Sequence, residues 1–82
     1  MPAIHRGGLH WLLWERSDVH RRLVTVDQKA LAEQLGVNRQ TVNRVLARMV
    51  NEGRIDKIAG TGPESREYKV VDPAEWQPPV TQ

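Results

Sequence analysis

The 82-residue sequence contains no cysteine, which excludes both a disulfide framework and a cysteine-ligated metal site. It also has no apolar run of the roughly 18–20 residues that a membrane-spanning helix requires. The first residues, MPAIHRGG, lack the apolar stretch of a secretory signal, so we expect a cytoplasmic protein with no membrane partner. A chain of this length forms one small domain with a single thin core, and such domains often gain stability from a partner subunit.

Patterns that indicate a metal site, a cofactor or catalysis are also missing. The histidines His5, His10 and His20 lack the spacing of a zinc site, and we interpret them as exposed side chains. No Gly-rich phosphate loop precedes a lysine, no Gly-x-Ser-x-Gly motif occurs, and no pair of carboxylates lies across an obvious cleft. We therefore predict that the protein is not an enzyme, has no catalytic residues, and binds no metal and no cofactor.

One segment of the chain lacks negative charge. The net charge is only +2, which does not by itself imply a polyanionic partner. From Arg39 through Asn51, however, the sequence has three arginines and no Asp or Glu. A cluster of cations on one helix is the electrostatic pattern typical of nucleic-acid binding.

Hydrophobic periodicity and turn residues divide the chain into an arm, a compact domain and a tail. Gly7-Gly8 end an expected flexible arm over residues 1–8, the domain covers residues 9–72, and residues 73–82 form a Pro-rich tail. The predicted elements are, in order, a helix over residues 9–23, a strand over 24–26, helices over 28–35 and 39–52, and strands over 54–58 and 67–71.

The two central helices have clear start and stop residues. Asp27 and Asn38 are typical N-caps, because a short side-chain oxygen accepts hydrogen bonds from the unpaired amides of a first helical turn. Gly36 supplies the positive φ that a tight turn after a helix needs, and Gly53 ends the next helix. The apolar residues of that helix recur at the spacing of one buried face, namely Val42, Val45, Leu46, Met49 and Val50.

This order of elements predicts a mainly α domain with a small β-hairpin, a winged helix-turn-helix with three helices and a two- or three-stranded antiparallel wing. The segment ALAEQLGVNRQTVNRVLARMVNEGRI resembles the DNA-binding domain of the Crp–Fnr regulators, and the resemblance covers about residues 24–71. The matching positions have physical reasons. Ala32 is small where two helices cross closely, Gly36 makes the turn, and Val37 fills the gap beneath it.

The resemblance implies a DNA-binding domain whose second central helix enters the major groove. It does not extend to the effector-binding domain of that family, so no cyclic-nucleotide response is expected. Gln40 stands where those regulators often have an acidic residue, which leaves the base preference open.

The polar face of residues 39–52 carries the candidate DNA contacts. Recognition helices read bases mainly with their N-terminal residues, so the base-contacting candidates are Arg39, Gln40, Asn43 and Arg44. The phosphate-contacting candidates are Gln28, Asn38, Thr41 and Arg48. Asn38 and Thr41 fit a purely structural role equally well, and a solvated helix face is the alternative for the whole set.

The predicted wing adds three candidates. Arg66 lies at the loop end, where it can reach an adjacent minor groove whose negative potential attracts arginine. Lys57 and Lys69 would follow the DNA backbone. The alternative is a solvated hairpin, which the acidic neighbours Glu64 and Glu67 favour.

We interpret the chain as a sequence-specific double-stranded DNA-binding protein associated with the nucleoid. It is expected to be a transcriptional regulator of a prokaryote, phage or plasmid, acting as a repressor or as a small architectural factor. A homodimer is expected because one module reads few bases, with possible contacts at Trp11, Trp14 and Trp76. Core packing is the alternative role of the first two, and Trp76 is able to attach the tail to the domain. Two alternative functions remain: a protein–protein interaction module on the same scaffold, and a DNA-processing accessory factor for excision or replication initiation.

Overall fold

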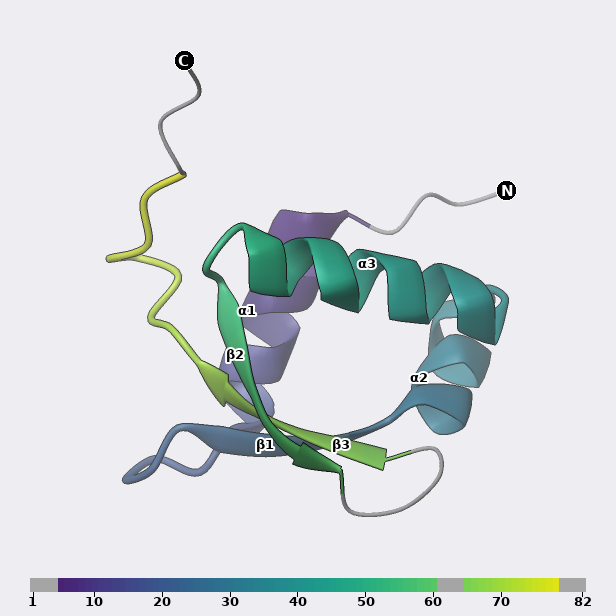
Figure 1. Ribbon diagram of the computed structural model, residues 1–82, viewed down its shortest axis with the longest axis horizontal. Helices are drawn as coiled ribbons and strands as arrows, with labels where there is room; N and C mark the ends of the chain where they lie inside the picture. Colours follow the sequence, from purple (N-terminus) through teal and green to yellow (C-terminus); the bar gives the residue numbers. More distant parts are fainter. Residues whose placement is uncertain (1–4, 61–64, 79–82) are drawn as a thin grey trace.

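The part of the chain that the structure describes folds into three helices and a three-stranded antiparallel sheet (Figure 1). The computed structural model describes residues 5–60 and 65–78. The elements are α1 Arg6–Arg16, β1 Leu23–Asp27, α2 Gln28–Leu35, α3 Arg39–Asn51, β2 Ile55–Gly60 and β3 Ser65–Val70. The sheet order is β1-β3-β2, so the short strand before α2 joins the hairpin as its third strand. The predicted winged helix-turn-helix is therefore confirmed, in its three-stranded form.

The first helix differs from its prediction at both ends. It begins at Arg6 instead of Leu9, because the His5 side chain caps it by accepting a hydrogen bond from the Gly8 backbone N–H at 3.3 Å. The Gly7-Gly8 pair therefore lies in the first helical turn and does not end an arm. Residues 1–4 and 79–82, the outer parts of the predicted arm and tail, lie outside the described residues, as does Glu64.

The same helix ends at Arg16, well before the predicted end at residue 23. The Asp18 carboxylate accepts hydrogen bonds from the backbone N–H groups of His20 and Arg21 at 2.8 and 3.0 Å. Such side-chain to backbone bonds compete with helix formation. The chain turns here and enters β1 through Arg22, which has a φ of 55°.

A single core lies between the helices and one face of the sheet. It is formed by Leu9, Leu13, Val24, Val26, Leu31, Ala32, Val42, Leu46, Met49, Ile55, Tyr68 and Val70. Ala32 is buried as the resemblance implies. The predicted apolar face of α3 is confirmed, with Val42, Leu46 and Met49 buried and the flanking Val45 and Val50 partly buried.

Alternation along the central strand β3 decides which wing residues face α3. Tyr68 and Val70 are buried on the core face, so Arg66 lies on the same face and Lys69 on the opposite one. Lys57 of β2 pairs with Tyr68 in the antiparallel register and belongs to the α3 side. The three predicted wing residues therefore do not share one face.

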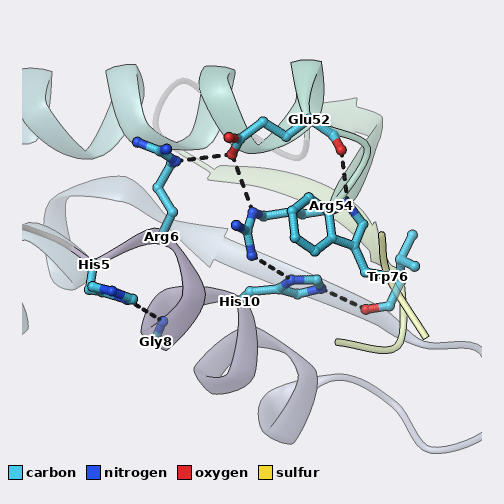
Figure 2. Close-up of polar contacts among 8 residues, drawn as sticks. His5, Arg6, Gly8, His10, Glu52, Arg54 and Trp76 are labelled. Carbon is cyan, nitrogen blue, oxygen red and sulfur yellow. Dashed lines mark hydrogen bonds and ion pairs between the residues drawn. The ribbon is translucent and has the colours of Figure 1, made fainter. Parts of the chain in front are cut away.

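His10 is buried, with 1% of its surface exposed, so the prediction of an exposed side chain is wrong at this position. Its ring lies between the Val71 carbonyl and the Arg54 side chain, which satisfy both ring nitrogens (Figure 2). Trp76 packs on the same cluster and attaches the start of the tail, as predicted, by donating its indole N–H to the Glu52 carbonyl at 2.8 Å.

Candidate nucleic-acid interface

Helix α2 and its turn form the support for the candidate interface. The Asp27 side chain accepts a hydrogen bond from the Ala30 backbone N–H at 3.1 Å, which confirms the predicted cap. At the other end Gly36 has a φ of 68°, and the Val37 N–H donates to the Ala32 carbonyl at 3.0 Å. The left-handed Gly36 and this hydrogen bond end α2 and give a hydrogen-bond donor to a carbonyl that a helix C-terminus otherwise leaves without one. They also turn the chain sharply into α3.

Helix α3 is defined at both ends by equally local chemistry. The Asn38 side-chain oxygen accepts from the Gln40 backbone N–H at 2.7 Å, so the predicted N-cap is confirmed. After the helix, Gly53 has a φ of 76°, and the Arg54 N–H donates to the Met49 carbonyl at 2.9 Å. The helix therefore begins and ends at defined residues, and three of its residues are buried on its inner face.

The outer face of α3 is a continuous polar surface. Its exposed residues are Arg39, Gln40, Asn43, Arg44, Ala47, Arg48 and Asn51. All four residues predicted to contact bases are in this set, and so is Arg48. Because α3 has no acidic residue, no carboxylate of the helix itself opposes the approach of an anion.

The remaining phosphate candidates differ in accessibility. Asn38 is exposed and Thr41 is half-buried, both next to the α3 N-terminus, where the positive end of the helix dipole favours anions. Gln28 is buried at the start of α2, with 9% of its surface exposed. Its side chain is therefore less suited to a phosphate contact than the sequence pattern implies.

A groove of about 350 Å³ separates α3 from the wing. It is lined by Gln28, Asn43, Ala47, Val50, Asn51, Lys57, Arg66 and Tyr68. The fold thus brings the candidates Gln28, Asn43, Lys57 and Arg66 together, while Lys69 lies on the opposite face of the sheet. Among the described residues that line this groove, none is acidic.

Tyr68 and Asn51 are groove residues that the sequence prediction did not assign to the site. Tyr68 belongs to the core face of β3, and burial raises the pKa of its phenol while the nearby Arg66 charge opposes that shift. Asn51 lies in the last turn of α3 and lines the same groove as Lys57. The strand register, which pairs Lys57 with Tyr68, places Tyr68 on the groove side, whereas the helical periodicity of α3 places Asn51 on its outer face.

Over residues 5–60 and 65–78, no group of three or more His, Asp or Glu side chains is placed to hold a metal ion. None of the helices described there has both the length and the apolar character needed to cross a membrane.

The chain matches one family model, described as the Crp-like helix-turn-helix domain, over residues 9–75. Comparison of the chain with curated proteins and with solved structures gives no match. The family match spans both central helices and the wing, and it agrees with the architecture and with the polar face of α3. Together these findings indicate a DNA-binding domain, and the chain belongs to the Crp-like helix-turn-helix domains.

Proposed function

We propose that this domain is a transcriptional repressor that binds double-stranded DNA sequence-specifically and inserts α3 into the major groove. The observation that carries the proposal is the outer face of α3, where three exposed arginines alternate with amide side chains and no carboxylate is present. A face required only for solubility would normally mix charges, because opposite charges one turn apart stabilise a helix by about 0.2–0.5 kcal/mol per pair.

Base reading is assigned to the N-terminal half of α3. Arginine pairs bidentately with the O6 and N7 atoms of guanine, and Asn or Gln with the N6 and N7 atoms of adenine. Arg39, Gln40, Asn43 and Arg44 are exposed on the half of the helix that enters a major groove first. Each such pair contributes roughly 1–3 kcal/mol of discrimination between bases.

Phosphate contacts would hold the helix in place on the duplex. Arg48 lies one turn beyond Arg44 and suits the backbone better than the base edges. At the other end of α3, the Asn38 amide and the Thr41 hydroxyl lie at the helix N-terminus, where the positive end of the helix dipole favours anions. Both ends of the helix therefore carry groups that can donate hydrogen bonds to phosphate oxygens.

The groove between α3 and the wing suits the DNA strand that separates the two grooves of the duplex. With α3 in the major groove and the wing beside the minor groove, that strand must cross the space between them. Lys57 and Arg66 line this space and are proposed to lie near its phosphates. Lys69 lies on the other face of the sheet, so we exclude it from the proposed interface.

A homodimer on a two-fold operator is the proposed assembly, because a single module buries limited surface and reads few bases. Trp11 is the candidate contact that the fold favours, with 49% of its surface exposed. Trp14 is half-buried under the Arg22 guanidinium, which lies 3.7 Å from the ring centroid. Trp76 packs against Arg54 within its own chain.

Selection of binding sites from random duplexes tests the proposal, followed by titration of the selected site at two salt concentrations. A defined consensus with strong salt dependence is expected, and a palindromic consensus would also indicate the dimer. Binding that ignores sequence would overturn the repressor function. No retention on DNA at moderate salt would favour a protein-interaction module.

A further inference from the structure

A partly buried polar cluster joins the first helix, the end of α3 and the C-terminal segment (Figure 2). Its centre is His10 of α1. The Nε2 atom of His10 lies 2.7 Å from the Val71 carbonyl oxygen, and its Nδ1 atom lies 3.3 Å from Nη1 of Arg54.

These two contacts determine the protonation state of His10. A carbonyl oxygen only accepts hydrogen bonds, so Nε2 must carry a proton and donate it to Val71. A guanidinium group only donates, so Nδ1 must present a lone pair to Arg54. Both hydrogen bonds exist together only when the imidazole is neutral and in the Nε2–H tautomer.

Arg54 connects His10 to the rest of the cluster, because it also contacts Glu52 and Trp76. Its Nε donates to the Glu52 carboxylate at 3.2 Å, and the same carboxylate oxygen accepts from Arg6 Nε at 3.0 Å. The Arg54 guanidinium lies 3.8 Å from the Trp76 ring centroid, a cation–π contact. The Trp76 indole then donates to the Glu52 backbone carbonyl at 2.8 Å.

We propose that His10, Arg54 and Trp76 form a proton-sensitive latch, which holds residues 72–76 against the C-terminal end of α3 and opens when His10 is protonated. A proton on Nδ1 would place two donors and two positive charges 3.3 Å apart. Arg54 then has to move, and the face of Trp76 loses its cation partner. The indole bond to Glu52 is the contact that opening would break.

The surroundings of His10 include some groups that lower its pKa and others that raise it. Burial is the largest influence and lowers the pKa of His10 below the usual 6.5, the hydrogen bond to Val71 raises it, Arg54 lowers it, and Asp72 raises it. Glu52 forms ion pairs with Arg54 and Arg6, and neither of these contacts involves the imidazole. Because the folded-state pKa lies below the unfolded value, the latch contributes its stability above pH 6.5 and loses it as the pH falls through the lower, folded-state value.

The latch also bears on DNA binding, and this part of the inference rests on the proposed function. Glu52 is the C-cap of α3, and its carbonyl and carboxylate are held by Trp76, Arg54 and Arg6. Opening the latch releases the contacts of Glu52 with Arg54 and Trp76 at the end of the recognition helix, and only the ion pair with Arg6 is left. We therefore expect weaker DNA binding at low pH.

The test follows the indole N–H resonances of the full chain by NMR between about pH 8 and pH 5, the range in which histidine titrates. Trp76 is assigned with the variant Trp76→Phe. On acidification the Trp76 resonance should move toward the position of the exposed Trp11 indole and exchange faster with water. In His10→Gln it should stay in place, because the amide has an NH₂ group that donates and a carbonyl that accepts, and it does not titrate in this pH range. His20→Gln, at an exposed histidine outside the cluster, should behave like the parent chain.

A ring-nitrogen spectrum of the unsubstituted chain gives a second measurement that needs no variant. His10 should be in the Nε2–H tautomer at neutral pH, and its titration midpoint should coincide with the Trp76 shift. A charged or Nδ1–H imidazole at neutral pH would overturn the latch. So would a Trp76 resonance that does not move, or one that titrates equally in His10→Gln.

Titration of the selected duplex over the same pH range tests the link to α3. The affinity of the parent chain should fall more on acidification than that of His10→Gln. The Trp76 resonance could shift as expected while DNA binding depends on pH equally in the parent chain and in His10→Gln. That outcome would support the latch and refute its effect on α3. Absence of DNA binding at every pH would refute the proposed function and leave the NMR result to decide the latch.

Discussion

The side-chain oxygen of Asn38 accepts a hydrogen bond from the backbone N–H of Gln40 at 2.7 Å. The oxygen is thus used by the helix cap, and only the amide NH₂ of Asn38 is left to donate to a phosphate. The structural and the DNA-binding roles of this residue therefore belong to different atoms, which makes them separable by substitution.

Asn38→Asp and Asn38→Ala should separate these two roles. Aspartate keeps the capping oxygen, so Asn38→Asp should leave the free energy of unfolding nearly unchanged, whereas Asn38→Ala should lower it by about 0.5–2 kcal/mol. Asn38→Asp also directs a negative charge at the phosphate, and it should weaken DNA binding by roughly tenfold, or about 1.4 kcal/mol. Urea unfolding and DNA titration measure the two effects. Equal DNA affinity of Asn38→Asp and the parent chain would exclude a phosphate beside Asn38.

Arg44 and Arg48 should give different DNA-binding defects. Arg44→Ala should lose roughly 1–3 kcal/mol on the selected site and relax the preference at one base pair. Arg48→Ala should weaken binding to all sequences alike and reduce the slope of log affinity against log salt by about 0.9. Arg21→Ala is the matched control, because this exposed arginine lies in the turn before β1. Unchanged affinity in both test variants would mean that α3 does not dock as proposed.

Lys57 and Lys69 form a matched pair on the two faces of the wing. Lys57 lines the groove beside α3, whereas Lys69 is exposed on the opposite face, across from Asp56 in the strand register. Lys57→Ala should therefore weaken DNA binding and reduce the salt slope by about 0.9, while Lys69→Ala should leave the slope unchanged. Titrations at several salt concentrations measure this difference. The reverse order of the two variants would show that the other face of the sheet approaches the DNA.

Substitution by alanine should change the free energy of unfolding in opposite directions at Gly36 and at Gly8. Gly36 has a φ of +68° and no atom within 4 Å of an added Cβ, so Gly36→Ala meets only the backbone penalty of about 1–2 kcal/mol. Gly8 lies within α1, where an added Cβ would be 3.9 Å from His5 Cβ, an ordinary contact. Gly8→Ala should therefore stabilise the domain by roughly 0.5–1 kcal/mol. Denaturant unfolding of both variants is the measurement, and a stabilised Gly36→Ala would contradict the left-handed turn.

The central helices were predictable because their boundaries depend on nearby residues. Asp27 and Asn38 cap helices within three residues of themselves, and Gly36 and Gly53 end helices by a conformation that glycine adopts without strain. The first helix was less predictable. A Gly-Gly pair usually indicates a break, but here the His5 side chain caps the turn that contains it.

The candidate site was predictable only where it lies on one helix. Exposure of Arg39, Gln40, Asn43 and Arg44 follows from the periodicity of α3, since one face must be buried. The face of the sheet on which each wing residue lies depends on how the strands pair. A shift of one residue in that register would exchange the faces of Arg66 and Lys69.

By itself, the sequence determined the helix-turn-helix and the polar face of α3, because caps, glycine turns and helical periodicity act over a few neighbouring residues. Only the tertiary structure decided the burial of His10, whose partners Arg54 and Val71 are 44 and 61 residues away in the chain. The same holds for the groove between α3 and the wing, since Lys57 and Arg66 meet there through strand pairing. Contacts of this kind form when distant segments exclude water together, and no local pattern records which segments will meet.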